Sequence, residues 1–396
     1  MRPLLPRQTP PPSPAMKTRS PSSTRVSRKR SRTVNPRRRS RTVNPSFADL
    51  PSSLVEVIMS LLVLKDNIRA SAACRSWREA GLSVRVVEKH PWLMRFPKRG
   101  NSFELRDPLQ WKKHYTLELP ELAGSTVCYS KDGWLLMHRA SSNDIFFFNP
   151  FTRELVSFPK LEPSFLDIAF SCPPLSDNCV VLALDYNRLG QERMITISTC
   201  LLGATEWITT TEQFLDGSQV CYKLSKLVYV KDRFFCFDCS HGSGGYCMYT
   251  FHPPSSKWMS YVSPCLGRYD QRRYLYASSV YLFEKEGQLI LMHTSGNDNP
   301  RVFKLSSFGR LELMWKIERD ALTLFVSFYN SELRTNLPWM RNSVYFSRFG
   351  HGRKRCVSYS FDQGKYHPRN EEQIWRQRCP PQSIWINPPK NVLNYL

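Results

Sequence analysis

The sequence lacks any long uninterrupted apolar run. None approaches the roughly 20 residues that a helix needs to cross a bilayer, and the start of the chain lacks the apolar stretch of a secretory signal. No Asn-x-Ser/Thr glycosylation site occurs either. The twelve cysteines are scattered through 396 residues instead of framing a short disulfide scaffold, which is typical of a reducing compartment. We therefore expect neither a membrane protein nor a secreted one.

Acidic and aromatic side chains are missing from residues 1–45. This segment holds thirteen Lys and Arg, nine Pro and twelve Ser and Thr, so it carries more than half of the formal net charge of +23. A segment of this composition cannot bury enough apolar surface to offset its ordering entropy. The sequence therefore predicts a disordered basic tail over 1–45.

Two basic clusters in the tail resemble a nuclear localisation signal. They consist of Arg28, Lys29, Arg30, Arg37, Arg38 and Arg39. A nucleic-acid-binding arm or a solvated tail without an address are the alternatives. An organelle transit peptide is disfavoured, because the prolines interrupt the amphipathic helix that a mitochondrial one needs.

A small helical module is predicted over residues 46–90. Ser53 and Glu56 have the spacing of a capping box, and the apolar residues that follow recur every three or four positions. Asp66 is placed to cap a second helix, and a third helix holds Trp77 and runs past Gly81. Three helices in about 40 residues make too small a core to be stable alone. The module must therefore complete its core against a partner, or against the main domain of its own chain.

Nine residues of this module stand at a characteristic spacing: Leu50, Pro51, Leu54, Ile58, Leu61, Leu64, Ile68, Cys74 and Trp77. This spacing resembles the F-box, the motif that docks substrate receptors onto the Skp-type adaptor of Skp–cullin–F-box ubiquitin ligases. The resemblance implies that all nine contribute to adaptor binding. Leu50, Pro51, Leu54 and Ile58 would lie in the interface, and the others would be shared with internal packing.

A β-rich body is predicted over 116–396, after a linker at 91–115. Short aromatic and β-branched runs alternate with Gly, Asp, Asn and Pro, and the order of strand, tight turn and strand recurs about every 50 residues. This repeat predicts a kelch-like β-propeller of about five to six blades, with 383–386 as a closing strand that pairs with the first blade. A two-sheet sandwich or barrel is the alternative. The whole chain is thus expected to be a multidomain α plus all-β protein.

The body also resembles the propeller-like domain of a plant-expanded group of F-box and F-box/kelch-repeat proteins. The matching stretches are 129–136, 147–154 and the pairing of 171–174 with 179–181. The group has no shared catalytic residue, so the resemblance implies capture of a protein substrate for ubiquitination.

Few patterns in the sequence indicate chemistry. Cys236, Cys239, His241 and Cys247 have some metal-ligand character, but the second pair lacks zinc-finger spacing, so we expect no metal and no cofactor. No catalytic residue is predicted. Two basic-aromatic loops are the candidates for substrate binding, with solvated loop charge as the alternative. Their basic residues are Arg268, Arg272, Arg273, Arg353, Lys354 and Arg355.

These observations predict a non-enzymatic adaptor that joins a protein substrate to a Skp-type adaptor and a cullin ubiquitin ligase, in the nucleus, the cytoplasm or both. The alternative from another class is a nuclear nucleic-acid-binding or scaffold protein that uses the basic tail. We expect that this chain does not bind nucleic acid as its main partner and that it does not bind a membrane.

Overall fold

The computed structural model describes the helical module and most of the β-rich body. The described residues are 47, 50–62, 67, 69–84, 90–110, 114–162, 164–189, 192–213, 226–238, 246–263, 279–294, 299–306, 311–314, 321–337, 339–349, 356–368, 379 and 381–388. The tail predicted to be disordered, residues 1–45, lies outside them. Within the described ranges no helix is long and apolar enough to cross a bilayer.

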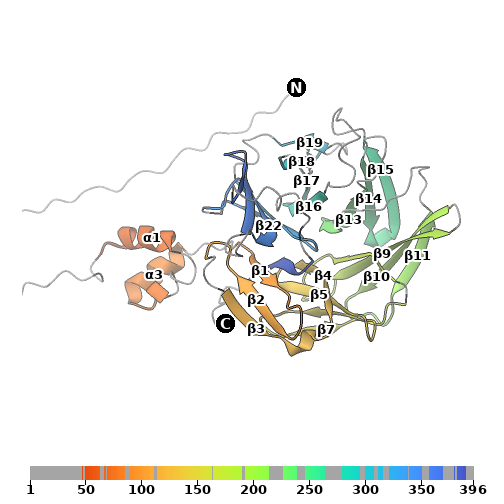
Figure 1. The fold of residues 1–396 in the computed structure, drawn as a ribbon, viewed down its shortest axis with the longest axis horizontal. Helices are drawn as coiled ribbons and strands as arrows, with labels where there is room; N and C mark the ends of the chain where they lie inside the picture. Colours follow the sequence, from red (N-terminus) through yellow and green to blue (C-terminus); the bar gives the residue numbers. More distant parts are fainter. Residues whose placement is uncertain are drawn as a thin grey trace, which may run out of the picture.

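Two helices are described in the module, α1 (Ser52–Leu61) and α3 (Arg75–Ser83), and they pack on one another outside the ring of strands (Figure 1). Helix α1 begins after Pro51, and no side chain caps its first turn. The predicted capping box is therefore wrong: Glu56 accepts a hydrogen bond from the Ser83 hydroxyl of α3 at 3.2 Å instead. Helix α3 runs past Gly81 as predicted, while Asp66 lies outside the described residues.

The described strands form six sheets that follow one another around a ring, as predicted for a β-propeller (Figure 1). Blade 1 has the order β25 (Ser383–Ile386), β1 (Trp92–Arg95), β2 (Ser102–Arg106), β3 (His114–Glu118). Blade 2 is β4 (Thr126–Lys131), β5 (Trp134–Arg139), β6 (Asp144–Phe148), β7 (Leu155–Ser157). Blade 3 is β8 (Asp167–Phe170), β9 (Val180–Leu189), β10 (Glu192–Leu201), β11 (Ile208–Gln213).

The second half of the ring continues this pattern. Blade 4 is β12 (Val228–Val230), β13 (Arg233–Asp238), β14 (Tyr246–His252), β15 (Lys257–Ser263). Blade 5 is β16 (Ser279–Lys285), β17 (Gln288–Thr294), β18 (Arg301–Leu305), β19 (Leu311–Leu313). Blade 6 is β21 (Ser331–Thr335), β20 (Leu322–Val326), β22 (Ser343–Phe349), β23 (Cys356–Ser360), β24 (Lys365–His367). Short 3-10 turns occur at η2 (Pro120–Leu122) and η3 (Pro253–Ser255).

Blade 6 departs from the four-stranded pattern. Its fifth strand arises because β20 and β21 form a hairpin at the inner edge, and β20 then pairs in parallel with β22. A parallel pair needs a connection that crosses back past the sheet, and the chain makes that crossing between the end of β21 and the start of β22.

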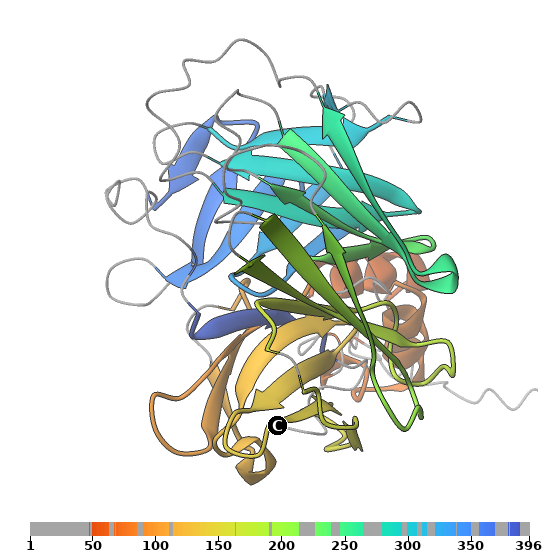
Figure 2. The same ribbon diagram turned by 90° about the vertical axis from the view of Figure 1, so that its right-hand side faces the viewer.

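The C-terminal strand β25 closes the ring by pairing antiparallel with β1, so 383–386 is a closing strand as predicted, but its partner precedes the predicted body of 116–396. Figures 1 and 2 show this dark blue strand beside the orange strands of blade 1. The expected linker at 91–115 is wrong, however, because β1 and β2 lie within it and β3 begins there. These strands complete a blade only with β25, which no local pattern reveals.

Apolar clusters fill the spaces between consecutive blades, so the core of the body is a ring of layers. The layer that joins the two ends of the chain consists of Leu93, Phe325, Leu337, Met340 and Trp385, all buried. The Trp385 ring meets Phe325 edge-on at 5.1 Å between centroids, and its indole N–H donates to the Val326 carbonyl at 3.0 Å. Blade 6 is thus fixed to blade 1 by packing and by a hydrogen bond.

Candidate functional site

Helix α1 carries two apolar faces, and its own module covers only one. Val55 and Met59, four residues apart, point into the small core with Ala80 of α3 and are fully or almost fully buried. Leu54, Val57 and Ile58 remain 52, 57 and 36 % exposed. Because residues three and four apart share one side of a helix, these three side chains form a single exposed surface, which we call the α1 outer face.

The small core holds α1 and α3 together tightly enough to position the α1 outer face. A Cβ atom added to Gly81 would lie 2.3 Å from the Ser71 hydroxyl and 2.5 Å from the Met59 methyl group. The Asn67 amide, which is buried, donates to the Met59 carbonyl at 3.1 Å. A side chain at position 81 would therefore force the Met59 methyl group and the Ser71 hydroxyl to shift from their places in the small core.

The structure places six of the predicted adaptor-binding residues within the described module. Pro51, Leu54 and Ile58 are exposed, and Leu50 and Trp77 pack partly against the small core. Cys74 is half-buried at the start of α3. Leu61 ends α1, with its side chain outside the description, and Leu64 and Ile68 lie outside the described residues.

Three large exposed apolar residues of the described module were missed from the sequence, and one of them, Phe47, is 78 % exposed. Val57 and Leu82 are 57 and 55 % exposed. Val57 lies three residues after Leu54, so the helical spacing of α1 could have identified it. The resemblance to the F-box pointed only to matching positions and therefore passed over it.

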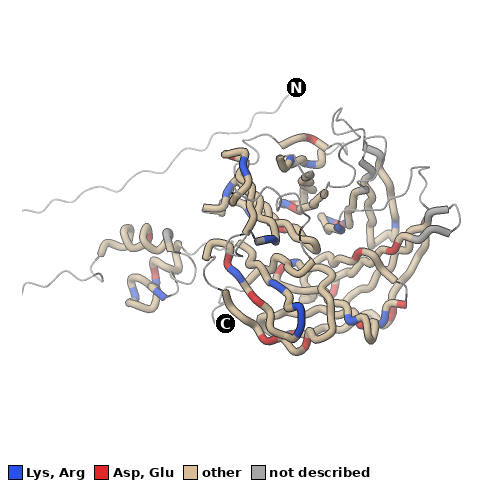
Figure 3. Tube along the Cα trace, in the orientation of Figure 1, with Lys and Arg blue, Asp and Glu red and all other residues tan. Residues whose placement is uncertain are grey.

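The remaining predicted residues give no site within the description. The basic clusters of the tail and the six basic residues of the two loops lie outside the described residues. Cys236 is buried in β13, and no group of metal-ligating side chains is found among the residues that the structure describes. Along the described propeller, residues of both signs are scattered over the chain trace (Figure 3).

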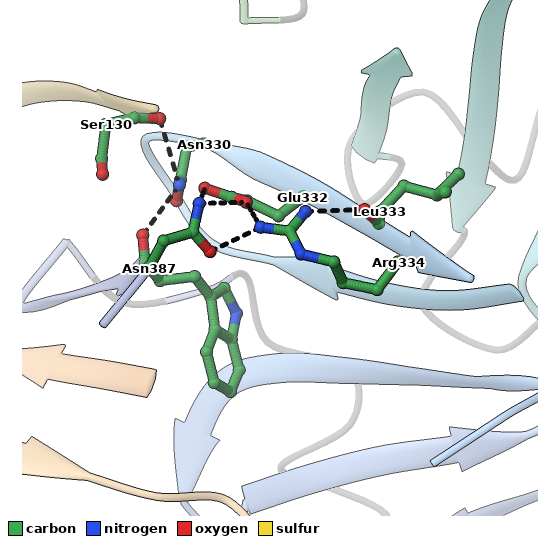
Figure 4. Close-up of polar contacts among 7 residues, drawn as sticks. Ser130, Asn330, Glu332, Leu333, Arg334 and Asn387 are labelled. Atoms are coloured by element: carbon green, nitrogen blue, oxygen red, sulfur yellow. Dashed lines mark hydrogen bonds and ion pairs between the residues drawn. The ribbon is translucent and has the colours of Figure 1, made fainter. Parts of the chain in front are cut away.

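A buried polar network lies where the innermost strands of blades 1, 2 and 6 meet (Figure 4). The Asn330 amide donates to the Trp385 carbonyl at 2.9 Å and to the Ser130 carbonyl at 3.3 Å. One side chain of blade 6 thereby contacts the adjacent blade 1 and also blade 2 beyond it. We call this set with Glu332, Arg334 and Asn387 the axial network.

Glu332 is the charged centre of the axial network. Its carboxylate accepts hydrogen bonds from Arg334 at 2.6 Å and from the Asn387 amide at 3.1 Å, and Arg334 also donates to the Asn387 side chain. Burial raises the pKa of Glu332, and the charge of Arg334 opposes that rise. The geometry assigns this network to closing the ring, because the bonds of Asn330 and Asn387 join segments that are far apart in the chain. The pair of Arg334 with Glu332 lies within β21.

A second polar contact crosses the axis near the turn between β20 and β21. Asp167 at the start of β8 accepts from Lys226 at 2.8 Å and from the Leu227 backbone N–H at 3.1 Å. The Lys226 ammonium also lies 5.4 Å from the centre of the Phe328 ring in blade 6. Blades 3, 4 and 6 are therefore in contact around the axis.

Comparison with known proteins gives consistent matches over most of the chain. Residues 102–370 match the family described as KIB1-4 beta-propeller. The chain is 56 % identical over 354 residues to the F-box protein At4g00893 of Arabidopsis thaliana, with 88 % of each chain covered. It is 36 % identical over 354 residues to the F-box/kelch-repeat protein At1g57790 of the same organism, covering 87 % of this chain and 95 % of that one.

A third relative supports the same assignment. The F-box protein At3g56470 of Arabidopsis thaliana is 35 % identical over 360 residues, covering 88 % of this chain and 90 % of the relative. The word F-box is common to the names of all three relatives, whereas kelch occurs in the name of At1g57790 alone among them. The kelch-like character of the blades therefore stays a prediction.

Proposed function

Because this chain belongs to the F-box proteins that carry a KIB1-4 beta-propeller, we propose that it is the substrate-recognition subunit of a Skp–cullin–F-box ubiquitin ligase. In this proposal the helical module binds a Skp-type adaptor and the propeller binds a protein substrate. The chain itself acts as an adaptor and catalyses no reaction.

The α1 outer face is the observation that carries the proposal. Leu54, Val57 and Ile58 are adjacent on one side of a helix, yet each remains more than a third exposed. Scattered single apolar residues are normal on a surface, but a contiguous set on one helix is typical of a docking surface. A partner helix that packs against this face would complete the core that the module leaves open.

The mechanism is tethering. A substrate bound to the propeller stays attached through the module to the cullin-bound conjugating enzyme, which raises the local concentration of substrate lysines near the charged enzyme. The contacts that close the ring support this role, because a rigid propeller holds the substrate at a defined distance from the module.

Co-elution tests the proposal with the full chain. Purified chain and a purified Skp-type adaptor, mixed and passed over a gel-filtration column, should elute together in equimolar amounts. Separate elution at micromolar concentrations, where such docking helices bind, would contradict the proposal.

We also propose that the basic clusters of the tail direct the protein to the nucleus. Clusters of Lys and Arg in a segment without acidic residues are typical of import signals. Location and adaptor binding are then separable functions of different parts of the chain.

A further inference from the structure

The loop that crosses blade 6 between β21 and β22 exposes a large aromatic side chain. Trp339 is 76 % exposed, although Leu337, two residues before it, and Met340, directly after it, are only 3 and 1 % exposed. Both belong to the apolar layer that joins blade 6 to blade 1. The loop is therefore anchored in the core while its tryptophan faces solvent.

Hydrogen bonds fix the loop at both ends. The Asn336 backbone N–H donates to the Ala321 carbonyl at 2.8 Å, and that of Asn342 donates to the Leu322 carbonyl at 2.6 Å. The Thr323 hydroxyl donates to the Met340 carbonyl at 3.0 Å, in a buried position. The conformation of the loop is thus set by blade 6 before any partner binds.

This conformation is strained at the tryptophan. Asn336, Trp339 and Asn342 have φ angles of 54°, 66° and 53°, in the left-handed region. Asparagine adopts this region readily, but it is unfavourable for a bulky residue. Glycine would avoid the strain at 339, and the indole buries little surface against its own chain. The stability of the fold therefore does not explain a tryptophan here.

We propose that Trp339 is the anchor of a protein-docking site that binds a segment with both apolar and acidic side chains. Tryptophan and arginine are the residues that most often dominate the binding energy of protein interfaces, and Arg341, two residues further on, is also exposed. An apolar side chain of the partner packs on the indole and a carboxylate pairs with the guanidinium. A preorganised loop loses little entropy on binding.

The charge of the chain decides between possible occupants. Residues 46–396 carry a net charge of +10, so a second copy of this chain would bring charge of the same sign, and self-association is disfavoured. An acidic segment is attracted by the same charge. If the chain has the function proposed above, on which this step rests, the acidic segment belongs to the protein substrate and is the element by which the propeller recognises it.

Peptide selection tests the inference with a defined probe. A phage-displayed library of random peptides of about twelve residues is selected on the full chain and counter-selected on Trp339→Gly. The selected peptides should combine Asp or Glu with apolar residues. Their affinity should fall at least tenfold in Trp339→Gly and in Arg341→Glu, and should be unchanged in Leu313→Ala, which truncates another exposed side chain of the propeller.

Folding and the proposed function are controlled separately. Glycine relieves the strain at 339, so Trp339→Gly should unfold at a urea concentration close to that of the unsubstituted chain. It should also bind the Skp-type adaptor normally, whereas a variant of the α1 outer face should keep peptide binding. The inference is overturned if no selected peptide distinguishes Trp339→Gly, if the peptides lack acidic residues, or if single-stranded oligonucleotides bind this loop more tightly than they do.

Discussion

Truncating the α1 outer face should weaken adaptor binding by a calculable amount. Leu54 and Ile58 are 52 and 36 % exposed in the free chain, so about half of the first residue and about a third of the second are left for a partner to cover. Burying a whole Leu or Ile side chain contributes about 1.5–3 kcal/mol. Covering the exposed parts should therefore contribute about 1 kcal/mol for each residue, and truncation to alanine also leaves a gap in the interface.

The double variant Leu54→Ala/Ile58→Ala should consequently lose about 2–4 kcal/mol, which is about a 30- to 1000-fold rise in Kd for a Skp-type adaptor. Isothermal titration of the purified adaptor into the full chain measures it. Neither side chain belongs to the small core around Val55 and Met59, so the module should remain folded. Unchanged hydrogen exchange in α1 and α3 would show this.

A matched control exists on the propeller. Leu201 and Ile208 are 51 and 62 % exposed, so Leu201→Ala/Ile208→Ala removes the same two residue types from a similarly exposed surface. This control should bind the adaptor with unchanged affinity. The reasoning is refuted if the α1 variant binds as tightly as the unsubstituted chain, or if both double variants lose affinity equally.

Three further predictions concern other parts of the chain. Gly81→Ala should loosen the packing of α1 on α3 at a cost of about 1–3 kcal/mol, seen as faster hydrogen exchange in the module and weaker adaptor binding with unchanged exchange in the blades; equal exchange in both proteins would contradict the close approach. Burial raises the pKa of Glu332 in the folded protein above its ordinary 4.5. Protonation of Glu332 therefore stabilises the folded protein fully below pH 4.5, and this contribution to the free energy of unfolding is lost as the pH rises through the folded pKa. Urea unfolding measures the free energy of unfolding of the unsubstituted chain and of Glu332→Gln. As the pH falls from neutral, the unsubstituted chain should gain stability relative to the variant, and a difference that stays constant with pH would argue against this reasoning. Deleting residues 1–45 should leave adaptor affinity unchanged and reduce nuclear accumulation of a fluorescent fusion, whereas loss of adaptor binding would favour a binding role for the tail.

Much of the architecture follows from local sequence pattern. The repeat of strand, turn and strand over 126–157 is enough to predict blade 2, because a tight turn at Asp132 and Gly133 joins two apolar runs. The period of α1 likewise predicts its apolar faces. These features depend on residues that are near one another in the chain.

Features that depend on distant residues could not be predicted in this way. The prediction of a linker at 91–115 is wrong because β1 has only four residues and one of its two partner strands, β25, is at the other end of the chain. The axial network could not be predicted either, because Ser130, Asn330 and Asn387 are far apart in the chain and meet only in the closed ring (Figure 4). The parallel pairing of β20 with β22 was also missed, since the hairpin to β21 lies between them.

The axial network and Trp339 share a further property. Neither carries a motif, because the relevant observation is burial of charge in one case and exposure of an aromatic residue in the other. Sequence alone reports which residues are present and says little about which are covered. The α1 outer face could be predicted only because helical spacing reports both of its sides.

Hydrogen–deuterium exchange of the full chain with and without a Skp-type adaptor tests the central claim most directly. If the helical module binds the adaptor and the propeller binds another partner, exchange should slow in α1 and α3 when the adaptor binds and should not change in the six blades. Protection in the blades, or no protection of α1, would contradict the account.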